Sequence, residues 1–255
     1  MSTVLITGSA DGLGQLAAQR LVAAGHEVLL HARNESRGRD ALAAVPGAVG
    51  VLLADLADVS EIRELADQAN AHGRLDAVIH NAGIGYREPR RIETADGLSH
   101  VFAINVLAPY LLTVLITRPE RLVYLSSGLH RGGDRDLSDL QWRRRPWDGL
   151  QAYSDSKLFD VMLAFAFARL WPDVLSNALE PGWVATKMGG RGAPDDLELG
   201  AETQAWLAVS DEPAARVSGR YFYHRAERAT HPVASDHRLQ DGLLDACAEL
   251  SGVSP

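Results

Sequence analysis

Two side chains four residues apart, Tyr153 and Lys157, form the pair in this chain that best fits acid–base chemistry. On a helix they lie one turn apart and share a face. A phenol with a pKa of about 10 is a weak acid–base catalyst at neutral pH, but a neighbouring ammonium favours the phenolate and lowers that pKa. The pair could therefore give a proton to a nascent alkoxide or take one from an alcohol. Tyr-x-x-x-Lys also occurs by chance, so a helix-start Tyr beside an exposed Lys is the alternative.

A glycine-rich stretch near the N-terminus predicts a nucleotide site. It follows a short apolar run, opens a helical pattern and has the spacing Gly-x-x-x-Gly-x-Gly. Small residues at such a turn let the backbone approach a pyrophosphate, and the helix N-terminus favours its negative charge. The candidate cofactor-binding residues here are Gly8, Ser9, Asp11, Gly12, Leu13 and Gly14. A tight strand-to-helix turn without a ligand is the alternative.

The ends of the second and third predicted strands bear on cofactor choice. Ala32-Arg33 stands where a cofactor without a 2′-phosphate usually meets a carboxylate. A guanidinium can instead bind a 2′-phosphate through charge-assisted bonds, so Arg33 indicates NADP(H), although it could be a surface arginine. Asp55-Leu56 follows the third strand. Asp55 could reach an adenine edge or cap the next helix.

Further polar residues follow the later strands. Asn81-Ala82-Gly83 follows the fourth strand, where small residues suit a crevice that a cofactor enters, or simply a turn. Ser126-Ser127 ends the fifth strand, at the sheet edge where such folds bind ligands, and a hydroxyl there could hold a substrate carbonyl. Asn105 is an amide in an otherwise apolar helix and needs partners, such as a water toward Lys157 or a local kink near Pro109.

Short β-branched runs alternate with helical patterns along the whole chain. This alternation predicts an α/β fold: a doubly wound parallel sheet (Rossmann fold) with helices on both faces, forming a single domain over residues 1–255. The predicted strands are Val4–Thr7, Val28–His31, Val49–Ala54, Ala77–His80, Leu122–Leu125, Val174–Leu179 and Arg220–Tyr223. The predicted helices are Leu13–Ala24, Ser36–Ala44, Ser60–His72, Val101–Thr117 and Tyr153–Trp171.

Composition restricts the classes of partner and compartment. The net charge is −8 without a basic stripe, which argues against nucleic acid and anionic membranes as partners. The single cysteine, Cys247, excludes a disulfide framework and fits a reducing, cytoplasmic location. The N-terminus has no basic region followed by a cleavage site, so no signal peptide is expected. The uncharged run Val101–Thr117 is short for a membrane span and predicts a buried helix.

Two stretches interrupt the alternation. Gly128–Leu150 holds five Arg, four Asp and two Trp without a clear period, and it is too long for an ordinary connection. The run Arg143-Arg144-Arg145 within it favours a solvated face over a phosphate site. Gly189–Leu197 is rich in Gly, Pro and Asp and predicts a flexible loop.

Taken together, these residues resemble the short-chain dehydrogenase/reductase family, and the resemblance covers most of the chain. The matching positions are Thr7 to Gly14, Asn81-Ala82-Gly83, Asn105, Ser127, Tyr153, Lys157 and Pro181-Gly182-Trp183-Val184-Ala185-Thr186.

The resemblance implies a role for each matching residue. Tyr153 is the acid/base, and Lys157 tunes it and binds the nicotinamide ribose. Ser127 orients the substrate carbonyl, and Asn105 holds a proton-relay water. The cofactor-lining residues implied after the sixth strand are Pro181, Gly182, Val184 and Thr186, and Arg33 resembles the family's NADP-selecting arginine.

This chain departs from the family pattern in one respect. Ser127 and Tyr153 are separated along the sequence by about twice as many residues as in the family's shorter members. The extra length, with Ser126-Ser127-Gly128-Leu129-His130, resembles the retinol-dehydrogenase-like and protochlorophyllide-reductase-like branch. It leaves the substrate class open. Candidates for an apolar substrate wall and lid are Trp142, Trp147, His130 and the Gly189–Leu197 loop, all of which could equally be packing residues.

The sequence thus predicts an NADP(H)-dependent oxidoreductase that passes a hydride between nicotinamide and a small-molecule carbonyl or secondary alcohol. One alternative is an NADPH-binding regulator without turnover, although this chain keeps all four catalytic residue types. Another is a reductase of activated C=C bonds.

Self-association is also expected, as a homodimer or tetramer. The helices around Val101–Thr117 and Tyr153–Trp171 are apolar on several faces and must be buried on more than the sheet side. A second copy packed around a two-fold axis would cover them. The alternative is that the segment His231 to Leu250 folds back over this surface and leaves a monomer.

Overall fold

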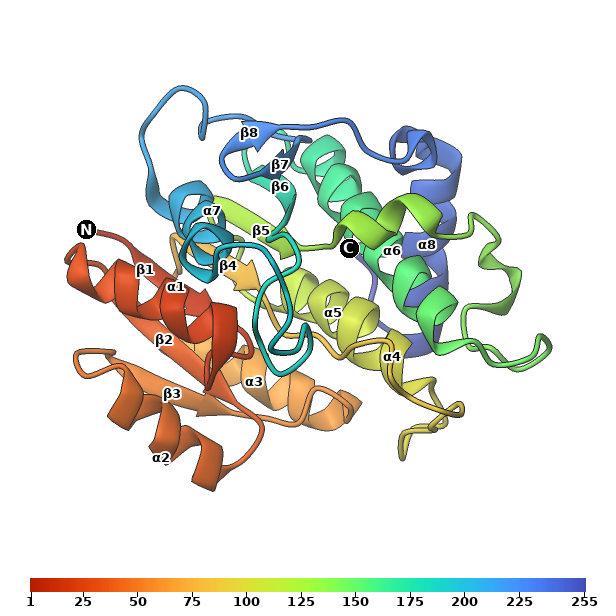
Figure 1. Ribbon diagram of the computed structural model, residues 1–255, viewed down its shortest axis with the longest axis horizontal. Coiled ribbons are helices and arrows are strands. Elements are labelled where there is room, and N and C mark those ends of the chain that lie inside the picture. The colour runs from red at the N-terminus through yellow and green to blue at the C-terminus, as the bar shows by residue number, and fades with distance from the viewer.

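The computed structural model describes residues 1–255 and is built around one eight-stranded sheet (Figure 1). The strand order is β3-β2-β1-β4-β5-β6-β7-β8, and every neighbouring pair is parallel except β7 and β8. The strands are β1 Thr3–Ile6, β2 Glu27–Ala32, β3 Gly50–Leu53, β4 Ala77–His80, β5 Arg121–Leu125, β6 Leu175–Glu180, β7 Tyr221–Tyr223 and β8 Ala226–Glu227. The predicted doubly wound α/β fold is confirmed.

Helices cover both faces of the sheet. They are α1 Gly12–Ala23, α2 Glu35–Ala44, α3 Val59–Ala71, α4 His100–Phe102, α5 Ala108–Leu115, α6 Gly149–Leu170, α7 Leu197–Val209 and α8 His237–Ser251. A π-helical turn, Ala103–Leu107, joins α4 to α5, and three short 3₁₀ turns span Gly128–Gly132, Leu137–Asp139 and Pro232–Ser235.

Alternating strand residues divide the core into two layers. Val4 and Ile6 of β1 pack with α1, α2 and α7, whereas Leu5 packs with α3, α5 and α6. This is the period-two alternation of a strand whose two faces are both buried. Strands β2 and β3 are added on one side of β1, and β4 and the later strands on its other side, so the strand order reverses beside β1. Such a switch point forms a crevice at the carboxyl ends of the strands.

The predicted elements agree with the structure to within a few residues. The helix expected over Val101–Thr117 occurs as α4, the π-turn and α5. The helix expected from Tyr153 begins earlier, at Gly149, because the Asp148 side chain accepts hydrogen bonds from the amides of Leu150 and Gln151. No helix is both long and apolar enough to cross a bilayer.

The sequence analysis assigned no element to α7, β8 or α8. Helix α8 lies against α6 and α5 on the side away from the sheet (Figure 1). Its buried residues Leu243, Leu244 and Cys247 belong to the same apolar cluster as α5 and α6. The fold-back of the C-terminal segment, considered above as the alternative to a second copy, is therefore present.

This cover removes the apolar surface on which self-association was expected. We therefore expect the chain to elute as a monomer, with a mass near 27.5 kDa by light scattering after size exclusion. A stable species of twice that mass would contradict this expectation and locate an interface elsewhere. Truncation after Ser235, which deletes α8, is expected to expose apolar area on α5 and α6 and to cause association.

Candidate active site

A cavity of about 1040 Å³ opens at the carboxyl ends of the central strands. The predicted site residues that line it are Gly8, Asp11, Gly12, Leu13, Arg33, Asp55, Leu56, Asn81, Ala82, Gly83, Ser127, Tyr153, Lys157, Pro181, Gly182, Val184 and Thr186. The other three, Ser9, Gly14 and Asn105, lie behind this lining and support it. The fold thus brings together residues that are up to 178 positions apart in the chain.

The turn between β1 and α1 is held close to the end of β4. The Asn81 side-chain amide donates to the carbonyls of Thr7 and Gly8, at 2.9 and 3.2 Å. A Cβ at Gly14 would lie 2.4 Å from Asn81 Nδ2 and 2.7 Å from the Gly8 carbonyl oxygen. Gly8 itself has φ +64°, and a Cβ there would lie 2.8 Å from Ala82 Cα. Glycine is thus required at both positions by close backbone approach.

The first turn of α1 fits a dinucleotide pyrophosphate. Asp11 occupies the N-cap position, but its carboxylate accepts no hydrogen bond from the helix amides. It pairs instead with Arg37 at 2.5 Å and Lys187 at 2.6 Å. Burial raises the pKa of Asp11, but the two cations lower it by more, so the net pKa lies below the usual value. The carboxylate therefore stays ionised, and the two cations offset its charge. The helix amides remain available to an anion.

A buried histidine that sequence analysis missed supports this turn. His31 Nδ1 accepts from the Gly8 amide at 2.9 Å, and Nε2 lies 3.0 Å from the Ala54 carbonyl oxygen. Burial lowers the pKa of His31 to about 4, so the ring is neutral at physiological pH and can accept at Nδ1 while donating at Nε2. The Ser9 hydroxyl accepts from the His31 backbone amide and completes the link.

The ends of β2 and β3 form the part of the cavity predicted to hold the adenosine half. Arg33 is exposed and makes no hydrogen bond or ion pair, and the buried Ala32 before it leaves no carboxylate at that point. Arg37, which sequence analysis also missed, lines the same region. Asp55 faces the cavity and does not cap α3; that alternative is wrong, because Asp58 is the N-cap.

Tyr153 lies at the other end of the cavity, on the first turns of α6. Its side chain is buried, and its ring meets the ring of Tyr86 edge to face, with 5.7 Å between the centroids. Lys157 Nζ lies 5.8 Å from the centroid of the Tyr153 ring. The Ser127 side chain lies close enough to the Tyr153 hydroxyl to lower the pKa of Tyr153. The structure therefore brings Ser127, Tyr153 and Lys157 together, as predicted.

The pKa of Tyr153 is raised, not lowered. Burial raises it, while the Lys157 charge and the nearby Ser127 side chain lower it by less. The predicted effect of the lysine thus has the right sign but does not dominate. Part of the reason is a third charge, Asp160, which also raises the pKa of Tyr153.

Asn105 lies within the π-helical turn that joins α4 to α5. Its Oδ1 accepts from the Ile84 amide at 2.8 Å, and its Nδ2 donates to the Ile84 carbonyl and the Ser156 hydroxyl. The amide is therefore satisfied by protein groups and ties the end of β4 to α6. A Cβ on Gly83 would be in van der Waals contact with both Lys157 Nζ and Asn105 Oδ1, at 3.4 and 3.5 Å, so Gly83 packs directly beside both groups.

His130 lies behind Ser127 and not in the cavity wall. Its Nδ1 is 2.7 Å from the Ser127 carbonyl oxygen, and its Nε2 accepts from the His231 amide at 3.2 Å. Burial lowers the pKa of His130 to about 4, so the neutral ring holds the Ser127 backbone. The suggestion that His130 forms a substrate wall is wrong, since it is fully buried under β7 beside Tyr221.

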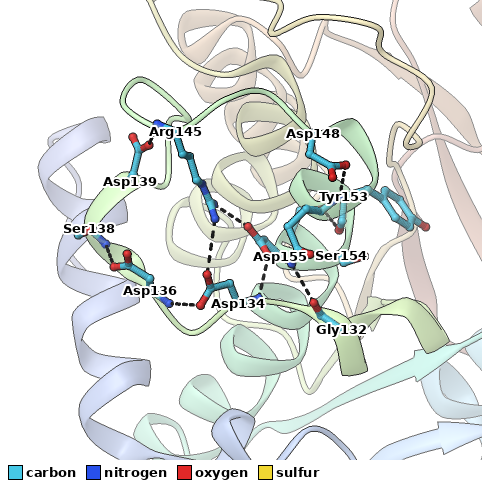
Figure 2. Close-up of polar contacts among 12 residues, drawn as sticks. Gly132, Asp134, Asp136, Ser138, Asp139, Arg145, Asp148, Tyr153, Ser154 and Asp155 are labelled. Atoms are coloured by element: carbon cyan, nitrogen blue, oxygen red, sulfur yellow. Dashed lines mark hydrogen bonds and ion pairs between the residues drawn. The ribbon is translucent and has the colours of Figure 1, made fainter.

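The insertion Gly128–Leu150 folds onto the outer side of α6 (Figure 2). Arg145 pairs with Asp155 at 2.7 Å and with Asp134 at 3.7 Å, and its guanidinium covers the Trp142 ring at 3.6 Å. In Figure 2 the Tyr153 ring points away from this network. Trp142 and Trp147 pack against each other and line no part of the cavity, so the expectation that they form its wall is wrong.

The segment between β6 and α7 closes one side of the cavity. Pro181, Gly182, Val184 and Thr186 face the cavity, and Gly12 would meet Thr186 if it carried a Cβ. The carboxylate of Asp195 accepts from the Trp183 amide at 2.5 Å, which draws the two ends of this segment together. Residues missed by the sequence analysis also line this side; they are Tyr86, Leu129, Glu180, Lys187, Met188 and Tyr223.

Comparisons with known proteins agree with this geometry. Residues 2–123 match the family model for short chain dehydrogenases. An uncharacterized oxidoreductase of Emericella nidulans is 45% identical over 99% of this chain and 98% of its own length. Human retinol dehydrogenase 13 is 31% identical over 98% of this chain and 85% of its own length. A crystal structure of a Mycobacterium paratuberculosis protein superposes with a TM-score of 0.87 at 27% identity, covering 100% of this chain and 94% of that one.

The chain belongs to the short-chain dehydrogenase/reductase family. It is an NAD(P)-dependent oxidoreductase, as its relatives' names and its fold indicate. The similarity to retinol dehydrogenase 13 confirms the resemblance to the retinol-dehydrogenase-like branch. A fit to the nicotinamide cofactor is supported by the uncapped first turn of α1 and by Asn81 Oδ1, a buried acceptor that has no partner within the protein.

Gly14→Ala tests the close packing under the cofactor turn. The added Cβ would overlap Asn81 and the Gly8 carbonyl, so the turn must move. We expect a loss of roughly 1–3 kcal/mol in unfolding free energy and weaker cofactor binding, measured by thermal denaturation and by fluorescence quenching with NADPH. Gly192→Ala is the matched control, because a Cβ there meets nothing within 4 Å and the backbone has no positive φ. Equal behaviour of the two variants would contradict the role of Gly14.

Proposed function

We propose that this protein is an NADP(H)-dependent carbonyl reductase in which Tyr153 donates the proton. The observation that carries the proposal is the cluster of the buried Tyr153 and Lys157 with the half-buried Ser127, at one end of a cavity whose other end is the glycine-rich turn. A bound nicotinamide supplies the hydride. The protein residues bind and orient the reactants and control the proton.

Each residue of the cluster has a distinct task in this proposal. The Ser127 hydroxyl orients the substrate carbonyl, and its own position is fixed by His130 through the Ser127 backbone carbonyl. The Tyr153 hydroxyl gives its proton to the developing alkoxide. Lys157 stabilises the phenolate that remains. Asn105 ties the end of β4 to the turn of α6 that carries Lys157.

The electrostatics of Tyr153 favour the reductive direction. Its pKa is raised by burial, so the phenol is protonated at neutral pH. A protonated phenol is the form that can donate to an alkoxide, whereas alcohol oxidation needs the phenolate as base. Reduction is accordingly expected to persist through neutral pH and to fall as Tyr153 loses its proton, at pH values above the usual range for tyrosine.

The proposed preference for NADP(H) rests on Arg33 and Arg37. Both line the adenosine end of the cavity, where β2 ends without a carboxylate. Arg33 makes no internal ion pair, so its charge is available to a 2′-phosphate. Arg37 is engaged by Asp11 at 2.5 Å, which leaves it a weaker candidate for that contact.

Tyr153→Phe tests the assignment of the proton donor. The ring and its packing against Tyr86 remain, and only the hydroxyl is lost. Turnover of a panel of ketones with NADPH should fall by at least about 10²-fold, while the dissociation constant for NADPH changes little. Tyr110→Phe is the matched control, since it removes a buried hydroxyl that bonds to Val253, near the C-terminus, at 2.7 Å. Retention of a tenth of wild-type turnover by Tyr153→Phe would mean that another group supplies the proton.

Arg33→Ala tests the cofactor preference. Loss of a charged hydrogen bond to the 2′-phosphate, worth about 1.5–3 kcal/mol, should weaken NADPH binding by roughly 10- to 150-fold and leave NADH binding unchanged. Isothermal titration calorimetry measures both constants. Arg39→Ala removes an exposed arginine of α2 that does not line the cavity, and it should alter neither. Equal wild-type affinities for NADPH and NADH would refute the assignment.

A further inference from the structure

A buried carboxylate contacts the Lys157 ammonium from within α6. Asp160 Oδ2 lies 2.7 Å from Lys157 Nζ, and the two side chains are only 4% and 5% exposed. Lys157 Nζ also donates to the Leu125 carbonyl at 2.8 Å. An ammonium has three donors, so two are used inside the protein and one remains for the cavity that Lys157 lines. Asp160 and Leu125 together hold this lysine in one position.

No other charge competes for Asp160. Lys157 is the only cation that acts on it, and its carboxylate in turn acts on Tyr153 and on Tyr124 of β5. Tyr86 is the remaining titratable group that faces Tyr153. Farther along β4, His80 bonds to Thr113, which bonds to Tyr124; burial lowers the pKa of His80 to about 3, so it is neutral. The local charges are therefore one ammonium, one carboxylate and the ionisable phenol of Tyr153.

The carboxylate has two consequences for the cluster. Burial lowers the pKa of Lys157, but Asp160 and Tyr153 together raise it by more, so the lysine stays charged although it is buried. The same negative charge opposes ionisation of Tyr153. Both effects make the Tyr153–Lys157 pair hold its protons to higher pH.

We propose that Asp160 is a positioning residue that fixes the Lys157 ammonium and sets the pH at which the Tyr153–Lys157 pair releases its first proton. The proposal rests on the function proposed above, in which carbonyl reduction needs both of these groups protonated. Asp160 touches neither the cavity nor a reactant, and it acts only through Lys157 and Tyr153.

Asp160→Asn is the principal test. The amide keeps the size of the side chain and an oxygen that can accept from Lys157, and it removes only the charge. Without the carboxylate, the pair should lose its first proton more easily. The alkaline fall in the rate of ketone reduction should therefore move to lower pH by about 1–3 units, the usual effect of one nearby charge. Asp160→Glu, which keeps the charge, should leave the fall near its wild-type position even where the maximal rate declines.

Asp155→Asn is the matched control. Asp155 is a buried aspartate of the same helix that also holds a cation, Arg145, at 2.7 Å. It points away from the Tyr153 ring (Figure 2). The same chemical change there should leave the pH profile in place. Equal shifts in Asp155→Asn and Asp160→Asn would mean a general effect on α6 and would overturn the proposal. An unmoved profile in Asp160→Asn would overturn it as well.

A second readout needs no turnover. Tyrosinate absorbance is titrated in the cofactor-free protein, and the curve of the matching Tyr153→Phe variant is subtracted to isolate Tyr153. Its ionisation should begin at lower pH in Asp160→Asn than in wild type. This outcome would support the role of Asp160 even if Tyr153→Phe kept its activity and the proposed function failed. If both Asp160 variants failed to fold while Asp155→Asn folded, Asp160 would be purely structural and the proposal overturned.

Discussion

The buried charge of Lys157 is the constraint on which the arrangement of the active-site half depends. An ammonium inside a protein costs several kcal/mol unless it is paired and hydrogen-bonded. Here Asp160 and the Leu125 carbonyl meet that requirement. Asp160 is on the same helix as Lys157, whereas the Leu125 contact requires that α6 lies against the end of β5. The Ser126 hydroxyl, which donates to the Lys157 carbonyl, and Ser156, which accepts from Asn105, fix the same turn of helix. Tyr153, one turn earlier, is positioned as a result.

A second constraint joins the two halves of the sheet. The glycine turn after β1 must approach the end of β4 closely enough for Asn81 to bond to Thr7 and Gly8, and His31 holds the turn from the β2 side. Asn81 and the Gly8 carbonyl leave no space for a larger residue at Gly14. The cavity therefore has a rigid floor at the switch point between β1 and β4. Its other end is formed by Tyr153 and Lys157 of α6.

Much of this could be predicted from the sequence, because the strands are short apolar runs that are buried on both faces. Their limits were correct to within two residues. Helices α7 and α8 were not assigned, although Asp196 and Asp236 cap them and Gly252, with φ +70°, ends α8. Those signals are local and could have been used. They were weaker than the family's motifs, which lie elsewhere in the chain.

The contacts that tune the site were harder to predict. His31 bonds to Gly8 and Ala54, each 23 residues away, and nothing in the local pattern marks it as a support rather than a core residue. The net pKa direction for Tyr153 depends on burial, which a sequence does not give. Asp160 is different, because its i+3 spacing from Lys157 is visible in the sequence and places the two on one helix face. What remained hidden was that this face is buried.

Most of the long connection between Ser127 and Tyr153 lies away from the cavity. Its arginines bond to Asp155, to the Gly97 carbonyl and to the Ser138 carbonyl, and its tryptophans pack beneath them. Leu137 approaches Gly242 of α8, so the segment links α6 to the C-terminal helix. Only its first two residues, Gly128 and Leu129, line the cavity, and the rest of that wall comes from the segment between β6 and α7 and from Tyr86 and Tyr223. The side chains available to contact a substrate therefore come mainly from segments at the ends of β4, β6 and β7, while most of the insertion packs on the helix that carries Tyr153, the proposed proton donor.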